Sequence, residues 1–251
     1  MKINKTIITG FVLISLFMAH LAFAEPLAVP SVSIGLGKVS KPGDITVLMQ
    51  IFFLITILSL APGLIIMTTS FTRIVVVLSF LRNAMGTQQA PSNQIIIALS
   101  LFLTFYIMGP VWQQINTQAI QPYKAQSISQ EQAIERATAP VRKFMLSQTR
   151  EKDLALFLNL SKMPRPNNAS EIPTLTIIPA FMISELRTAF QIGFLVYIPF
   201  LVVDMVVASV LMSMGMMMLP PVMISLPFKI LLFILVDGWG LIISSLVKSF
   251  G

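Results

Sequence analysis

Five charged side chains interrupt the apolar C-terminal part of this 251-residue chain, and they are the first candidates for chemistry. They are Glu185, Arg187, Asp204, Lys229 and Asp237. A charge at the centre of a bilayer costs about 2.5 to 3.5 kcal/mol on insertion scales, so each group needs a partner or water. The sequence therefore predicts ion pairs or a polar lining in this part of the molecule.

Asp204 and Lys229 lie equally far from a point between residues 216 and 217. An antiparallel helical hairpin that turns at this point would place the two side chains next to each other. We predict a structural ion pair, and a functional polar lining remains the alternative. If the two prolines that follow shift the turn, the register fails and each charge needs a partner from another helix or subunit.

Arrangements of catalytic residues are weakly represented. Asp204 and Asp237 could suggest an aspartyl protease dyad, but "LVVDMVV" and "LVDGWG" lack the glycine–aspartate setting of intramembrane aspartyl proteases. Ser225 and Lys229 have the i, i+4 spacing of a serine–lysine pair, with nothing else in support. Because no phosphate loop, Rossmann fingerprint or histidine-based metal motif occurs, we predict that the chain is not an enzyme and uses no metal or cofactor.

The residue counts exclude further classes. The chain has no cysteine and a single histidine, His20, which rules out disulfides, thiolate metal sites and a cysteine nucleophile. Its 17 Lys+Arg residues exceed the 10 Asp+Glu, but the excess is dispersed and few aromatic residues accompany it. This pattern argues against nucleic-acid binding.

Methionines crowd the segment "SVLMSMGMMMLPP", residues 209–221; they are Met212, Met214, Met216, Met217 and Met218. Thioethers are soft ligands, so one interpretation is a copper(I) site. A second is ordinary apolar packing at a helix end. A third uses the unbranched, adaptable side chain of methionine, which repacks around different contents. Several copies around an axis would then form a compliant apolar collar that blocks ions and yields to a passing chain.

The elements that carry these residues are those of a membrane protein. Apolar residues make up 55% of the chain, charged residues 11%, and the mean hydropathy is +0.84. Four apolar stretches approach or exceed the ~20 residues of a spanning helix; they are 45–67, 95–112, 189–212 and 222–247. We expect breaks within or beside them at Pro62-Gly63, Gly109-Pro110, Pro199 and Gly238-Trp239-Gly240. Residues 174–183 either extend the third stretch or form a separate helix.

We predict an all-α membrane protein of broken or kinked helical hairpins with four parts. These are a cleavable signal peptide (1–24), a segment with the first hydrophobic hairpin (25–112), a polar helical subdomain (113–173) and a C-terminal hairpin with the methionine-rich tip (174–251). Within 113–173, Ser129 to Gln132 has the spacing of a helix capping box. Between the first two stretches, 68–93 carries Arg73, Arg82 and no acid, as a short cytoplasmic loop should.

Cleavage of the signal and alternating spans would place 113–173 in the periplasm and the methionine tip on the cytoplasmic side.

The C-terminal half resembles a known family. "PAFMISELRTAFQIGFLVYIPF", residues 179–200, and "PFKILLFILVDGW", residues 227–239, look like the two signature stretches of the FliP family, the P subunit of the flagellar type III export gate. The resemblance extends through residues 60–112 and is least diagnostic in 113–173. It also covers the virulence injectisomes, whose relatives generally lack a signal peptide, so 1–24 favours the flagellar branch.

The resemblance implies a pore-forming subunit that assembles as a pentamer with FliQ and FliR homologues into a helical pore complex. Unfolded flagellar proteins, delivered by the large export gate proteins, would pass through it at the inner membrane, in the basal body, with the assembly reaching periplasmic level. The family's methionine gasket falls on Met216, Met217 and Met218, flanked by Met212 and Met214. Its charged signature positions fall on Glu185, Arg187, Lys229 and Asp237, as contacts within and between subunits. The alternatives are the equivalent injectisome subunit and a metal or small-solute transporter.

Overall fold

The computed structural model describes residues 42–87, 90–161, 168–216 and 219–251, in which every regular element is a helix. The all-α prediction is therefore confirmed for this part of the chain. The predicted signal peptide and two of the gasket methionines, Met217 and Met218, lie outside the described residues. The chain divides into two compact units, residues 1–54 and 55–251, and all the described site residues belong to the second.

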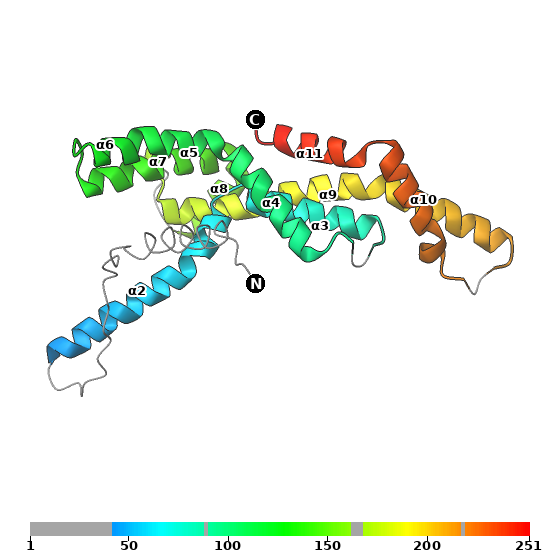
Figure 1. Cartoon of the computed structure of the whole chain (residues 1–251), viewed down its shortest axis with the longest axis horizontal. Helices are drawn as coiled ribbons and strands as arrows, with labels where there is room; N and C mark the ends of the chain where they lie inside the picture. Colours follow the sequence, from blue (N-terminus) through cyan, green and yellow to red (C-terminus); the bar gives the residue numbers. More distant parts are fainter. Residues whose placement is uncertain (1–41, 88–89, 162–167, 217–218) are drawn as a thin grey trace, which may run out of the picture. The chain divides into compact units, whose positions relative to one another are not determined.

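The helices follow one another with short connections (Figure 1). They are α2 (Pro42–Met67), α3 (Phe71–Ala84), α4 (Asn93–Ile107), α5 (Gly109–Ile115), α6 (Gln121–Lys124), α7 (Gln130–Gln148), α8 (Glu151–Leu160), α9 (Thr174–Ser213), α10 (Pro221–Leu235) and α11 (Gly238–Lys248), with a π-helical turn η1 (Asn116–Ile120) and a 3-10 turn η2 (Ala169–Glu171).

Two of these helices are long and apolar enough to cross a membrane, over Met49–Met67 and Thr174–Ser213. Two bent pairs join them if each counts as one span: α4 with the helical run Gly109–Lys124, at 54°, and α10 with α11, at 64°. The four predicted hydrophobic segments are thus present, in two straight and two broken forms.

The predicted breaks at Gly109-Pro110 and Gly238-Trp239-Gly240 are confirmed, and those at Pro62-Gly63 and Pro199 are not. Both prolines lie inside continuous helices. A proline removes one backbone donor, which a long apolar helix tolerates. The bend before α11 has a stronger cause, because Asp237 adopts a left-handed backbone conformation (φ 49°) that ends α10.

Helix α9 is the longest element, with 40 residues that run through Pro179 and Pro199. Residues 174–183 therefore extend the third apolar stretch and do not form a separate helix. At 1.5 Å per residue α9 is about 60 Å long, twice the ~30 Å thickness of the hydrocarbon core. We call residues 174–193 the anchored half of α9 and residues 194–213 its outer half.

Helix α3 corrects the predicted cytoplasmic loop at 68–93. Its residues Ile74, Val77, Leu78 and Leu81 recur at helical spacing and are buried in the larger hydrophobic core, where α3 makes extensive contact with α9. A Cβ on Gly193 of α9 would lie only 2.7 Å from the ring of Phe80, so the two helices pack closely at this point. The predicted loop thus contains a packed helix, and its side of the membrane stays a prediction.

The polar segment supplies a second, smaller core. Helix α7 begins with the predicted capping box, in which the Ser129 hydroxyl accepts from the backbone N–H of Gln132 and the Gln132 side chain accepts from that of Ser129. Helix α7 runs beside α5 and η1, and α7 and α8 both contact α9 (Figure 1). Buried Met145, Ile177 and Phe181 join α7 to the anchored half of α9.

Candidate functional site: buried charges and a methionine-rich hairpin

Glu185 is fully buried on α9 and pairs with Arg73 of α3. The Arg73 Nε donates to Glu185 Oε2 at 2.9 Å, and Nη2 donates to Oε1. This two-point geometry is the strongest arrangement for an arginine and a carboxylate. The predicted structural role of Glu185 thus has a definite partner within the same chain.

The remaining donors of Arg73 reach two other segments. Nη1 donates to the backbone oxygen of Ser249 at 2.8 Å, and Nη2 donates to the Gln148 side chain at 3.0 Å. The guanidinium lies 3.8 Å from the ring centre of Phe250, a cation–π contact. One buried arginine therefore joins α3, α7, α9 and the residues after α11.

Sequence reasoning missed Arg73 as a site residue because it read the segment as a loop. The signal that could have found it is the helical spacing of the apolar residues from Ile74 to Leu81, which places Arg73 on a buried helix. A buried arginine then demands an acid, and Glu185 is one of few acids in the apolar half.

Arg187 contacts Asp153, a residue that the sequence did not single out. The Arg187 side chain is about half exposed, and its Nη2 lies 3.3 Å from Oδ1 of the buried Asp153 on α8. Ser184 donates to the other carboxylate oxygen at 2.8 Å and accepts from the backbone N–H of Arg150. This cluster ties the start of α8 to the anchored half of α9.

Asp204 and Lys229 form the ion pair that their equal distance from the expected turn predicts. Lys229 Nζ lies 2.5 Å from Asp204 Oδ2 and donates to the backbone oxygen of Ala84, at the end of α3, at 3.2 Å. Ser225 donates to Asp204 Oδ1. The pair therefore sets the register between the outer half of α9 and α10. Each of these three ion pairs has one partner on α9.

Asp237 has a local role at the bend. Its carboxylate accepts from the backbone N–H of Gly240 and caps the start of α11. A Cβ on Gly238 would lie 2.1 Å from the Phe233 ring, and one on Gly240 would lie 2.4 Å from the Asp237 carboxylate. Residues 238 and 240 are therefore glycines because a Cβ at either position would collide with Phe233 or Asp237.

The methionine-rich tip begins where α9 ends in a Schellman motif. Gly215 has a left-handed backbone (φ 75°), its N–H donates to Met212 O, and the N–H of Met216 donates to Leu211 O. Helix α10 then starts at Pro221, whose fixed φ suits the first position of a helix. The side chains of Met212, Met214 and Met216 are all exposed in the single chain.

The arrangement offers little for the alternative chemistries. The Asp204 carboxylate binds Lys229 and Ser225, while Asp237 caps α11, so the two aspartates have different partners. Within the described residues no group of three or more His, Cys, Asp or Glu side chains is placed to hold a metal ion.

These features define a class: an all-α, membrane-type protein in which internal ion pairs fix a helical hairpin with an apolar, methionine-rich end. The FliP family profile matches residues 54–246. Curated relatives include the "Flagellar biosynthetic protein FliP" of Bacillus subtilis, 57% identical over 211 residues that cover 84% of this chain and 96% of the relative. Its namesake from Caulobacter vibrioides is 54% identical over 227 residues, covering 90% and 85%. That from Aquifex aeolicus is 52% identical over 224 residues, covering 88% and 92%. The chain belongs to the FliP family.

Proposed function

We propose that this protein is a component of the flagellar type III export apparatus, associated with the bacterial inner membrane in the flagellar basal body. Support comes from family membership and from the three relatives described above, which are named for flagellar biosynthesis; this favours the flagellar assignment over a virulence injectisome. The apolar helices are compatible with membrane insertion.

Within that apparatus we propose the role of a pore-forming core subunit. Several copies, a pentamer by family resemblance, assemble with FliQ and FliR homologues and receive unfolded flagellar proteins from the large export gate proteins. The supporting observation is the hairpin of α9 and α10, which is fixed in register by Lys229 and Asp204 and presents exposed methionines at its end. The polar helices of 113–173 belong to the periplasmic side of the assembly. Neither these helices nor the hairpin of α9 and α10 carries out catalysis.

Met216, Met217 and Met218 form the gasket in this proposal, flanked by Met212 and Met214. A gasket has to exclude ions when the pore is empty and also when it holds polypeptides of changing shape. Methionine suits both demands, since its flexible apolar side chain repacks at small cost. Glu185, Arg187, Asp204, Lys229 and Asp237 act structurally, by holding each hairpin in position.

The test replaces all three gasket methionines with alanine in the full-length protein, co-expressed with its FliQ and FliR homologues. We expect the complex to assemble and the inner membrane to leak ions, because the throat is wider and loses its adaptable lining. The matched control replaces Met49 and Met67, two exposed methionines of α2. Unchanged membrane conductance in the gasket variant would contradict the proposal, and stoichiometric copper binding by the purified protein would support a transporter instead.

A further inference from the structure

Two arginines border one turn of α9, on the side where α8 begins. The side chain of Arg150, the residue before α8, donates from Nη2 to Gln191 Oε1 of α9 at 2.6 Å. Arg187 lies one turn before Gln191, and residues four apart are neighbours on a helix surface. The two guanidinium groups are therefore held beside the same short surface of α9.

Both guanidinium groups keep donors for a further ligand. An arginine has five N–H donors in a fixed fork. Each of the two uses Nη2 for its contact within the described part of the chain, Arg187 with Asp153 and Arg150 with Gln191. The Arg187 side chain is 48% exposed, so an anion outside the chain can reach its other nitrogens.

The charges around this turn favour an anion. Three cations, Arg150, Lys152 and Arg187, stand against two acids, Glu151 and Asp153, which leaves a net charge of +1. The Asp153 carboxylate is buried and accepts from Ser184 on its other oxygen, so it contributes little to the surface. The exposed side chains are thus mainly positive.

An open, largely apolar groove of about 510 Å³ follows α9 at the same place. We call it the arginine-edged groove, and its lining residues are Ile183, Leu186, Arg187, Phe190, Gln191 and Phe194. Phe190 and Phe194 are both more than half exposed. The Phe190 ring contacts the ring of Phe80 on α3 edge-on, with 5.5 Å between the ring centres, and this contact holds it in position. A cationic edge therefore adjoins an apolar surface.

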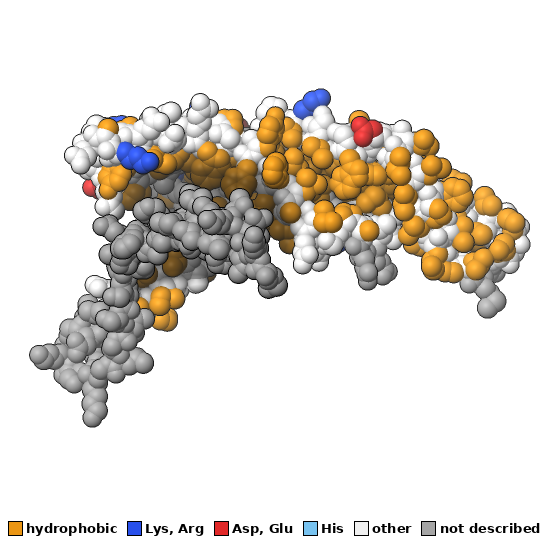
Figure 2. Space-filling model, in the orientation of Figure 1, with side chains coloured by type: hydrophobic (Ala, Val, Ile, Leu, Met, Phe, Trp, Pro, Cys, Tyr) orange, Lys and Arg blue, Asp and Glu red, His pale blue; other side chains and the backbone are white. Residues whose placement is uncertain are grey.

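The position of this edge along α9 matches the boundary of a bilayer. After Arg187 the one charged residue of α9 is Asp204, and Lys229 binds it. Residues 192–213 span about 33 Å at 1.5 Å per residue, close to the ~30 Å thickness of the hydrocarbon core. Figure 2 shows hydrophobic side chains across the visible face of α9 and α10. Arg187 and Gln191 then lie at the level of the lipid headgroups, which long arginine side chains can reach.

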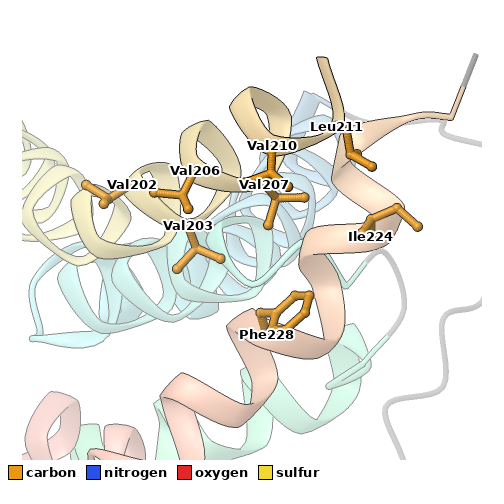
Figure 3. Close-up of a pocket in the computed structure, with 8 residues that line it drawn as sticks. All are labelled: Val202, Val203, Val206, Val207, Val210, Leu211, Ile224 and Phe228. Atoms are coloured by element: carbon orange, nitrogen blue, oxygen red, sulfur yellow. The ribbon is translucent and has the colours of Figure 1, made fainter. Parts of the chain in front are cut away.

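A second groove, between the outer half of α9 and α10, has no charged residue in its lining (Figure 3). Its volume is about 470 Å³, and its lining residues are Val202, Val203, Val206, Val207, Val210, Leu211, Ile224 and Phe228. Aliphatic and phenyl side chains do not distinguish one lipid headgroup from another. The second groove is thus an internal control for the arginine-edged groove.

We propose that Arg150 and Arg187 bind the phosphate of an anionic phospholipid, whose acyl chains lie along Phe190 and Phe194. Arginine suits this ligand because its planar fork forms two parallel hydrogen bonds with a phosphate. An anionic headgroup binds better than a zwitterionic one, because choline would bring another cation to a positively charged edge. The inference goes beyond the proposed function and rests on it only for the location in a membrane.

Lipid photolabelling tests the site. The full-length chain, co-expressed with the FliQ and FliR homologues, is reconstituted in phosphatidylcholine bilayers that contain a photoactivatable acyl chain on either phosphatidylglycerol or phosphatidylcholine. Peptide mass spectrometry then locates the label. We expect the phosphatidylglycerol probe to label the segment 190–194 about fivefold more than the phosphatidylcholine probe, and the two probes to label the second groove equally.

Two substitutions weaken the site without leaving Asp153 unpaired. Arg150→Gln removes a cation that contacts Gln191, and Arg187→Lys keeps a positive charge beside Asp153 but loses the planar fork. We expect the combined variant to label 190–194 equally with both probes. The matched control, Arg136→Gln with Lys143→Gln, removes two exposed cations of α7 and should keep the preference.

The outcomes separate this inference from the proposed function. Equal labelling of 190–194 by the two probes in the unmodified chain, or an unchanged preference in the combined variant, overturns the lipid site. A segment that takes up neither probe and instead crosslinks to a FliQ or FliR homologue is covered by protein, which also overturns it. These results leave the pore role intact, because the leak of the gasket variant tests that role separately. Recovery of the complex outside the membrane overturns both the proposed location and the lipid site.

Discussion

The two halves of α9 differ sharply although they belong to one unbroken helix. Of the nine buried residues on α9, seven lie in the anchored half, and only Phe200 and Leu211 lie in the outer half. The anchored half contacts α3, α7 and α8 and holds Glu185 and Arg187, whereas the outer half contacts α10 and contributes Phe200 to the larger core. One helix thus combines an anchored half that packs within the chain with an outer half whose apolar side chains are largely exposed.

This difference indicates that the buried charges stabilise the fold of the single chain, whereas the exposed apolar side chains are available for assembly. Charges are costly to bury, and the buried side chains of Glu185, Asp153 and Lys229 each have an oppositely charged partner within the chain. Exposed large apolar side chains are frequent on the outer half and on α10, where the proposed pore requires contact between copies. Lys229 of α10 binds both Asp204 in the outer half of α9 and the backbone oxygen of Ala84 at the end of α3, so it fixes the outer half relative to α3.

Removal of the Glu185 charge is expected to have the largest effect, because it attacks the anchored half at its centre. Glu185→Gln leaves Arg73 buried without its counter-charge, which costs about 3 to 5 kcal/mol in the free energy of unfolding. Unfolding in mixed micelles measures the loss. Glu135→Gln, at an exposed position of α7, is the control. Equal stability of the two variants would contradict a stabilising role of the buried Glu185–Arg73 pair.

Breaking the Lys229–Asp204 ion pair is expected to have the next largest effect on the free energy of unfolding. Lys229→Met keeps the side-chain volume and leaves Asp204 unpaired, and we expect a loss of about 2 to 4 kcal/mol. Hydrogen exchange should rise in α10 and in the outer half, while the anchored half stays protected. The double charge swap, Asp204→Lys with Lys229→Asp, should recover part of the loss. If it rescues neither single neutral substitution, the two residues are not partners.

Close packing in the anchored half gives a smaller effect at Gly193. In Gly193→Ala the new methyl group would approach the Phe80 ring within 2.7 Å, and the repacking costs about 1 to 3 kcal/mol. Gly63→Ala in α2 is the matched control, since no atom lies within 4 Å of its Cβ, and it should stabilise the helix by about 0.5 to 1 kcal/mol. Thermal unfolding distinguishes the two, and a neutral Gly193→Ala would show that α3 and α9 pack less tightly.

The smallest effect is expected at the tip. Gly215 needs its left-handed backbone to close the Schellman motif, but no atom lies near its Cβ position. Gly215→Ala therefore costs only the conformational penalty of about 1 kcal/mol. Hydrogen exchange of Met216 should rise, and the free energy of unfolding should fall by no more than this amount. A loss as large as that of Gly193→Ala would mean that the tip packs against the rest of the chain.

Periodicity and spacing predicted much of the molecule from the sequence. The apolar stretches, the capping box at Ser129 and the Asp204–Lys229 pair each depend on residues close in sequence or on a single turn, so counting sufficed. The bend at Asp237 was predictable for a similar reason, because two glycines flank Trp239 next to an aspartate.

The remainder depends on contacts between distant segments. Arg73 and Glu185 are 112 residues apart, and the pairing of Arg187 with Asp153 requires α8 to fold back onto α9. No spacing rule predicts such contacts. Nor does a proline in the sequence show whether a helix bends or continues, since that depends on what packs around it; α9 continues through both Pro179 and Pro199.

An image of the complex purified with co-expressed FliQ and FliR homologues tests the proposed pore most directly. It should show several copies around a common axis, with the thioethers of Met216, Met217 and Met218 turned towards that axis. Methionines turned outward to lipid, or a single stable protomer without partners, would contradict the proposal.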